Sequence, residues 1–302
     1  MGEIFLRWAL LLALFVSLPL CAQELEPRRW SHLPVGSSFA GFGSVYTDGS
    51  IRDIPSLEIE DADAEIYSAI ASYVHVFDVL GKTGRVDVLL PYSTARWDGL
   101  LRGESASTRR RGFNDPRLRF SVNLVGSPAQ RGDKFVKNYA DTIVGAAVEV
   151  VVPAGYYNGD RLLNISGNRW VVRPQFGVVH NRGKWSGELT ASAFFYEDND
   201  DFFGGKELEE EPVYAIQGHL IHTFRPGLWA SLSGAYGSGG RVKIDGERSG
   251  ERLKKTLWGL SFGLPIDARQ GIKFAYIRGD THKDTGSDSN RFLFAYSMMW
   301  GN

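Results

Sequence analysis

The chain has 302 residues, a formal net charge of −1 and 43% hydrophobic residues. This length allows one large domain or two small ones. The near-neutral charge gives no sign of nucleic acid or of an acidic substrate as a partner, and composition alone is typical of a soluble globular protein.

The first 22 residues have the form of a secretory signal peptide. Arg7 is followed by the apolar run WALLLALFVSLPL, which contains Pro19 and precedes the small residues Cys21 and Ala22. We expect cleavage after Ala22. A lipoprotein anchor on Cys21 is the alternative, although Leu20 is bulky for that reading, and an uncleaved membrane anchor is disfavoured because the run is short for a spanning helix. Cleavage removes the only cysteine and excludes a disulfide.

Ten later stretches alternate apolar and polar residues with a period of two over about ten residues, which is typical of membrane-spanning strands. A Gly-rich stretch near 37–46 and a stretch near 65–77 bring the predicted number of strands to twelve. In PRLRFSVNLVG, Leu118 and Phe120 occupy one face, and Arg117 and Arg119 occupy the other. For the stretch 65–77, periodicity leaves open whether Tyr67 or Ile66 belongs to the outer set. The twelve predicted strands are 37–46, 65–77, 84–92, 116–126, 141–152, 169–179, 185–196, 213–224, 228–236, 256–264, 271–277 and 292–300.

The connections between these strands alternate between long and short, with one exception at 126–140. Bacterial outer-membrane barrels have long outer loops, short periplasmic turns and an even number of strands. The pattern therefore predicts an all-β fold, a transmembrane antiparallel up-and-down β-barrel of 12 strands in the bacterial outer membrane. The alternative is a periplasmic all-β protein with one buried and one wet face.

In such a barrel the apolar rows face lipid and the polar rows face the lumen, because lipid does not solvate charge or open sheet edges. The charges inside either pair with one another or line a narrow pore, and both can hold together. Aromatic residues at strand ends (Trp170, Trp185, Tyr214, Tyr236 and Trp300) are expected at the membrane interfaces. The residues predicted to line the lumen are Arg85, Asp87, Arg117, Arg119, Glu149, Arg173, Gln175, Glu188, Gln217, His219 and Lys273.

Other patterns give weaker indications. His219 and His222 lie three apart and so point to opposite faces of a strand, which argues against a metal pair. The acidic stretch 197–211 could bind calcium through Asp198, Asp200 and Asp201, or be a solvated loop. The run Arg109, Arg110 and Arg111 could meet lipopolysaccharide phosphates, or be solvated. No G-x-S-x-G and no local serine–histidine pattern occurs, so we expect no enzyme, no cofactor and no metal.

Several segments resemble the outer-membrane transporters linked to the meta-pathway of phenol degradation. They are RRWSHLPVGSSFAGFGSVYTDG (28–49), LEIEDADAEI (57–66), DPRLRFSVNLVGSP (115–128), NRWVVRPQFGV (168–178), EDNDDFFGG (197–205), FRPGLWASL (224–232) and GSDS (286–289). The resemblance implies a twelve-stranded barrel with a narrow channel and an N-terminal segment folded into the lumen. It also implies small hydrophobic or aromatic solutes. In one departure from the usual outer-membrane ending, Gly301 and Asn302 follow Trp300.

Taken with this resemblance, the sequence predicts a signal peptide at 1–22, a lumen segment at 23–36 and a barrel at 37–302. In the lumen segment, Trp30 and Leu33 are expected to dock as apolar groups, and Arg28 and Arg29 to pair with lumen acids. Val171, Phe194 and Ile277 are apolar candidates along the path. The predicted function is passive passage of small hydrophobic or aromatic molecules, with membrane lipid and lipopolysaccharide as surroundings. The alternative is a non-conducting structural or adhesive barrel that acts through its loops.

Overall fold

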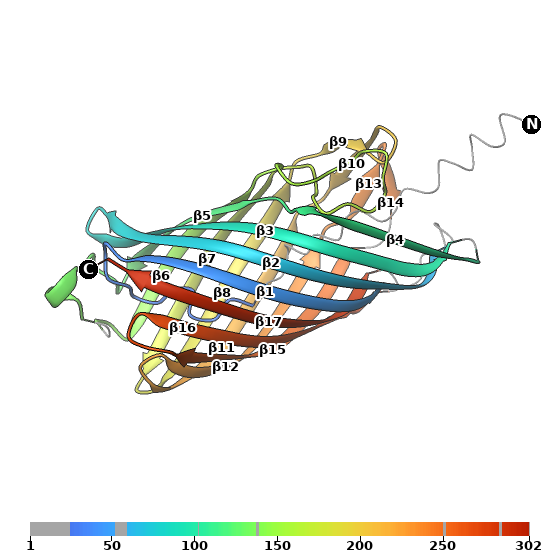
Figure 1. Ribbon diagram of the computed structural model, residues 1–302. Helices are drawn as coiled ribbons and strands as arrows, with labels where there is room; N and C mark the ends of the chain where they lie inside the picture. Colours follow the sequence, from blue (N-terminus) through green and yellow to red (C-terminus); the bar gives the residue numbers. More distant parts are fainter. Residues whose placement is uncertain are drawn as a thin grey trace, which may run out of the picture.

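Twelve long antiparallel strands form a closed barrel (Figure 1) in the computed structural model, which describes residues 25–301 except 52–58, 102, 137–138, 250–251 and 284–285. The ring closes because β2 pairs with both β1 and β3, while β1 also pairs with β17. The barrel strands are β1 (Ser38–Ile51), β2 (Ile59–Val79), β3 (Lys82–Leu101), β5 (Arg117–Val125), β6 (Thr142–Val151), β7 (Val171–Arg182), β8 (Trp185–Tyr196), β11 (Val213–Arg225), β12 (Leu228–Gly239), β15 (Leu253–Pro265), β16 (Gln270–Thr281) and β17 (Ser287–Trp300).

All twelve predicted strands are present, and the prediction of a twelve-stranded antiparallel barrel is confirmed. Several strands extend further toward the long-loop end than the alternation indicated: β2 begins at residue 59 and β17 at residue 287. The signal peptide and its cleavage site lie outside the described residues. Among the described residues, no helix is long and apolar enough to cross a membrane; the helix η3 (Gly132–Lys134) has a single turn.

Several segments expected to be loops contain short strands. Between the predicted strands 84–92 and 116–126, β3 continues to Leu101 and pairs with β4 (Glu104–Phe113), which lengthens one side of the barrel. The acidic stretch 197–211 forms β9 (Asn199–Phe202) and β10 (Lys206–Glu210). These join β13 (Val242–Ile244) and β14 (Glu247–Ser249) in a four-stranded sheet at the same end (Figure 1).

The two faces of the wall differ as the alternation predicted. On β5, Leu118 and Phe120 are 44% and 46% exposed, whereas Arg117 and Arg119 are buried. On β2, Tyr67 belongs to the outward row, and Ile66 is buried on the inward face. The five aromatic residues expected at the interfaces are all exposed at or near strand ends. Lipid therefore meets an apolar surface around the barrel.

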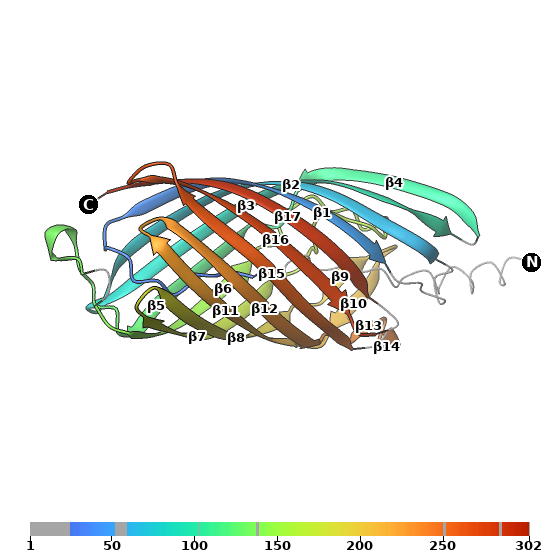
Figure 2. The same cartoon turned by 90° about the horizontal axis from the view of Figure 1, so that it is seen from below.

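The end of the barrel that carries the C-terminus has the short connections (Figure 2), and outer-membrane barrels place this end in the periplasm. Two-residue turns join β2 to β3, β7 to β8, and β11 to β12. In the first of these, Leu80 and Gly81 both adopt positive φ. The exceptional connection, between β5 and β6, lies at this end and contacts the N-terminal segment: the Val35 amide donates to the Gln130 carbonyl at 2.8 Å.

We predict that an arginine on the lipid-facing row of β5 is costly in a way that depends on depth. Phe120→Arg should lower the free energy of unfolding by about 2–4 kcal/mol relative to Phe120→Ala, because Phe120 lies in the middle part of β5, where the strand is expected to cross the hydrocarbon core. Leu124→Arg is close to the strand end and should cost at most about 1 kcal/mol relative to Leu124→Ala. Equilibrium unfolding in lipid bilayers measures both, and equal costs at the two positions would contradict the assigned depth.

Candidate functional site

Four inward residues on adjacent strands form a ladder of alternating charge. The strand register places Asp87 on β3 opposite Arg119 on β5, Arg119 opposite Glu149 on β6, and Glu149 opposite Arg173 on β7. Arg119 Nη1 lies 3.3 Å from Glu149 Oε2, and Arg173 Nη1 lies 3.5 Å from Glu149 Oε1. Opposite charges directly across a strand pair are favourable, so the register itself pairs these buried ions.

The ladder is closed at both ends. Arg85, two residues before Asp87 on β3, donates through Nε to Asp87 Oδ1 at 2.9 Å. At the other end the Arg173 guanidinium lies over the Phe194 ring, 4.5 Å from its centroid, in a cation–π contact. Each buried charge of the ladder therefore has at least one partner, as burial requires.

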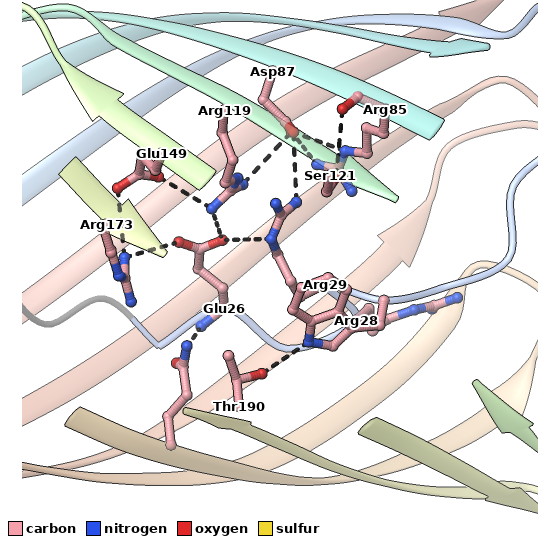
Figure 3. Close-up of polar contacts among 12 residues, drawn as sticks. Glu26, Arg28, Arg29, Arg85, Asp87, Arg119, Ser121, Glu149, Arg173 and Thr190 are labelled. Atoms are coloured by element: carbon pink, nitrogen blue, oxygen red, sulfur yellow. Dashed lines mark hydrogen bonds and ion pairs between the residues drawn. The ribbon is translucent and has the colours of Figure 1, made fainter. Parts of the chain in front are cut away.

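The N-terminal segment, residues 25–36, adds a carboxylate to this ladder. Arg119 Nη1 donates to Glu26 Oε2 at 2.5 Å, and Arg173 Nη1 lies 4.0 Å from Glu26 Oε1 (Figure 3). Arg29 of the same segment reaches Asp87 Oδ2 at 3.5 Å. Glu26 thus lies among arginines of two strands and of its own segment, and it ties that segment to the wall.

Electrostatics keep Glu26 ionised. Burial alone would raise its pKa, but the facing guanidiniums of Arg119, Arg29 and Arg173 outweigh burial and hold the pKa of Glu26 well below its ordinary value of 4.5. The contact between segment and ladder is therefore an ion pair at neutral pH, and acid weakens it by neutralising the carboxylate.

Trp30 anchors the segment on the neighbouring strands. Its side chain is 1% exposed, and its indole Nε1 donates to Thr190 Oγ1 on β8 at 2.8 Å. The ring lies over a directly paired pair of glycines, Gly145 on β6 and Gly177 on β7. A Cβ at either position would come within 2.3 Å or 2.0 Å of the indole. Only glycine leaves room for this ring.

The rest of the segment also contacts inward residues. Leu25 packs with Leu257 and Ile277, on β15 and β16. Toward the periplasmic end, His32 stacks on Phe135 with ring centroids 4.8 Å apart, and its Nδ1 lies 2.5 Å from Ser127 Oγ. These contacts run from the middle of the wall to the 126–141 connection.

The structure brings some of the predicted lumen residues together and leaves others apart. Arg85, Asp87, Arg119, Glu149 and Arg173 form the ladder. Glu188 accepts the Arg28 backbone N–H at 2.8 Å, and Gln217 accepts that of Glu26 at 3.4 Å. The Gln175 amide lies beside the Arg173 guanidinium, with one of its terminal atoms 3.0 Å from Arg173 Nε. Arg117, His219 and Lys273 also lie on the inward face of their strands.

In the N-terminal segment, the predicted contacts differ in detail from those observed. Arg29 pairs with a lumen acid and Trp30 is buried as expected. Arg28 meets Glu188 through its backbone, while its guanidinium lies over Trp229 at 5.3 Å. Leu33 is only half-buried, whereas Val35 is buried. Glu26 and His32 were not predicted. An acid two residues before the Arg28–Arg29 pair was the available signal for Glu26.

The histidines and acidic groups do not assemble a metal site among the described residues: no group of three or more His, Cys, Asp or Glu side chains gathers there. His222 points outward and contacts Trp185 with the rings tilted and their centroids 4.5 Å apart, while His219 points inward. His219 Nδ1 lies 2.8 Å from Ser233 Oγ, and its Nε2 has no hydrogen-bond partner among the described residues. A serine–histidine pair without an orienting carboxylate lacks the third member of a catalytic triad.

A closed twelve-stranded barrel with an apolar outer face and a charged inner face defines a bacterial outer-membrane β-barrel. Residues 45–293 match the family described as "Putative MetA-pathway of phenol degradation". The match covers most of the chain, and the chain belongs to this family. Among curated proteins, no match is found.

Solved structures share the fold. The COG4313 outer membrane channel from Pseudomonas putida F1 superposes with a TM-score of 0.75 at 23% identity, over 92% of this chain and 100% of that one. The β-domain of the Bordetella autotransporter BrkA gives 0.51 at 10% identity, over 88% and 100%. The transport unit of the autotransporter AIDA-I from Escherichia coli gives 0.50 at 8% identity, over 100% and 98%. The similar structures are outer-membrane channels and transport domains rather than enzymes.

We predict that removing the central arginine destabilises the barrel. Arg119→Ala leaves Glu26, Asp87 and Glu149 short of a buried partner and should lower the free energy of unfolding by about 3–5 kcal/mol. The matched control is Arg252→Ala, since Arg252 forms an exposed ion pair with Glu211 at 3.4 Å, and its loss should cost less than about 1 kcal/mol. Equal effects in denaturant titration would show that the ladder does not stabilise the fold.

Proposed function

We propose that this protein is a passive, non-enzymatic outer-membrane channel for small hydrophobic or aromatic molecules, in which residues 25–36 form a lumen plug that narrows the path. The family supports the link to phenol degradation, and the fold resembles that of an outer-membrane channel. The family match and the structural match both concern relatives of this chain. The inner face of the barrel supports the proposal independently of them.

The observation that carries the proposal is a set of inward polar atoms that the protein does not satisfy. Arg29 Nη2, Arg119 Nε, His219 Nε2 and Ser231 Oγ are buried and make no hydrogen bond to any described residue. Native interiors seldom leave such atoms unpaired, and water is the usual partner when protein supplies none. These atoms are closed to bulk solvent, so water that pairs with them is ordered and buried, and a polar inner face hydrated in this way supports a channel.

The wall opposite the charge ladder carries small side chains on its inward face, which favours a path along it. From β12 through β15, β16 and β17 to β1, the inward positions carry many small side chains, whereas the plug is held mainly by β3 and β5 to β8. The small inward residues are Gly41, Gly43, Ser231, Ser233, Ala235, Gly259, Ser261, Ala275 and Ala295. We place the path between the plug and this wall.

Apolar inward residues favour an apolar solute. Phe194 is buried with Val151, Val171 and Val213 in one inward cluster, and Ile277 belongs to the cluster that contains Leu25. Apolar surface with a few polar groups is the ordinary lining of sites for small hydrophobic molecules. The Arg–Glu ladder beside this surface can orient a phenolic hydroxyl by hydrogen bonding.

We predict that removing the plug raises the conductance. Full-length mature protein in planar bilayers should give small, steady channel events, and deletion of residues 24–36 should increase the unit conductance several-fold, because the plug fills part of the cross-section. A barrel without any channel events in either form would instead support the structural or adhesive alternative. An unchanged conductance after deletion would contradict the plug.

A size-exchange pair controls for indirect effects of the deletion. Gly177→Val should displace Trp30, since even a Cβ there would lie 2.0 Å from the indole, and it should raise the conductance. Adding Trp30→Ala to Gly177→Val frees the space and should restore part of the docking.

The solute class is tested in the same apparatus: catechol should reduce the ion current of the wild-type channel, whereas glucose should not.

We predict that acid opens the plug. Burial lowers the pKa of His32 below its ordinary value of 6.5, against the opposite effect of a hydrogen bond to Gln130. The docked state therefore binds fewer protons than the undocked state, so docking is weakened as the pH falls below about 6.5. Protonation of Glu26 acts in the same direction at lower pH. Conductance should rise on acidification.

The control for this pH effect is His32→Phe, which keeps a ring to stack on Phe135 but does not titrate. Its conductance at pH 7.5 should match the wild type, and the rise between pH 6.5 and pH 5 should be lost. A wild-type conductance that falls or stays level in acid would argue against docking of His32 in its neutral form.

A further inference from the structure

The outward face of the β3–β4 hairpin changes character along its length. On β3 the outward row reads Val86, Val88, Leu90, Tyr92, Thr94, Arg96 and Asp98 toward the outer end. The last apolar step is marked by Tyr92 and Phe113, whose rings meet edge to face with centroids 5.2 Å apart. Aromatic residues mark the membrane interface, so the residues beyond this pair lie at the level of lipid headgroups.

Beyond this aromatic pair, β4 presents two arginines to the outside. Arg109 and Arg111 share the outward face with Phe113 and are exposed. Arg110 is less exposed; its guanidinium turns back to Thr108 Oγ1 at 2.5 Å and to the Arg109 carbonyl at 2.9 Å. Only two of the three arginines of the TRRRG run are therefore available to a partner on the lipid side.

The register places like charges side by side. Arg109 lies directly opposite Arg96 on β3, and like charges directly opposite are unfavourable. Asp98 pairs with Arg96, with Arg96 Nε 2.7 Å from Asp98 Oδ2. Among the described residues, no carboxylate pairs with Arg109 or Arg111. This surface therefore lacks an anion that would neutralise it.

Beyond Phe113, whose carbonyl accepts the Tyr156 N–H at 2.7 Å, the strand edge beside these arginines has no strand partner among the described residues. In the described part of the chain, β4 pairs with β3 alone and ends the order of the large sheet. An unpaired edge exposes backbone N–H groups that can donate hydrogen bonds to an external partner. The Cα atoms of two arginines that lie two residues apart on one strand are about 7 Å apart. Both guanidiniums can therefore reach one phosphate group.

We propose that Arg109 and Arg111, with Arg96 beside them, form a binding site for the phosphate groups of lipopolysaccharide in the outer leaflet. The partner is a lipid because the arginines continue the row that faces hydrocarbon, and its charged group is a phosphate because planar guanidiniums bind phosphate in two-point fashion. The site is on the outer wall and is independent of the channel proposed above.

The experiment measures retention of bisphosphorylated lipid A by the purified full-length barrel, using native mass spectrometry. Arg109→Gln combined with Arg111→Gln should weaken apparent binding at least about tenfold, because two charge-assisted contacts are lost. Arg109→Lys with Arg111→Lys keeps the charges and should retain most of the binding. The matched control is Arg182→Gln with Arg269→Gln, two exposed arginines at the periplasmic end, and it should bind as the wild type does.

The chemistry of the ligand is tested with three further probes. Dephosphorylated lipid A should bind at least about tenfold more weakly than the bisphosphorylated form to the wild type, and equally weakly to the Gln variant. Phosphatidylglycerol and inorganic phosphate should not displace bisphosphorylated lipid A at equal concentration. Equal binding by wild type and Gln variant, no dependence on the phosphates, or displacement by either competitor would overturn the proposal. Heat-dependent gel mobility checks that each variant is folded, and the single Gln variants replace the double one if it is not.

Discussion

The constraint on which this structure depends is that a backbone in hydrocarbon must satisfy all of its hydrogen bonds within the protein. A sheet meets this requirement only by closing, and here β2 closes it by pairing on both sides. Once the sheet is closed, successive residues along each strand face different environments, one lipid and the next the lumen. Phe120 faces lipid and Arg119 faces the lumen because neighbouring side chains point to opposite faces.

The same register that closes the ring also builds the charge ladder. Asp87, Arg119, Glu149 and Arg173 would be costly buried ions if each stood alone. A slip of one residue on any of the four strands would turn its charge toward lipid. The ladder therefore stabilises the strand register as well as pairing the buried charges. Glu26 of the N-terminal segment binds Arg119 and Arg173, whose positions the ladder fixes.

The sequence predicted the strands better than their connections. Alternation over ten residues is a repeated signal, and it identified most of the barrel strands and the direction in which residues such as Arg117 and Arg119 point. It could not give the register, which depends on long-range pairing: nothing local says that Glu149 faces Arg119 on one side and Arg173 on the other. The extra strands β4, β9 and β10 were missed because their sequences are charged or short and lack an apolar row.

The N-terminal segment shows a second kind of limit. Trp30 could be named as a docking group, but the slot that receives it consists of Gly145 and Gly177, which are identifiable only from the pairing of β6 with β7. The position of His32 depends on its contacts with Phe135 and Ser127 in the β5–β6 connection. The sequence showed that this connection is unusually long but not why. Contact with the segment now accounts for the length of that connection.

The two kinds of anchor in this segment suit a lumen that contains water. Ion pairs buried away from water are seldom more stabilising than apolar packing of the same volume, so stability alone would favour an apolar plug. An apolar plug, however, would exclude water from the cross-section around it. Glu26 and Arg29 fix the segment through ion pairs with the wall, and Trp30 supplies apolar docking at one point only. A segment held at separate points, with polar surface between them, can narrow a path without sealing it.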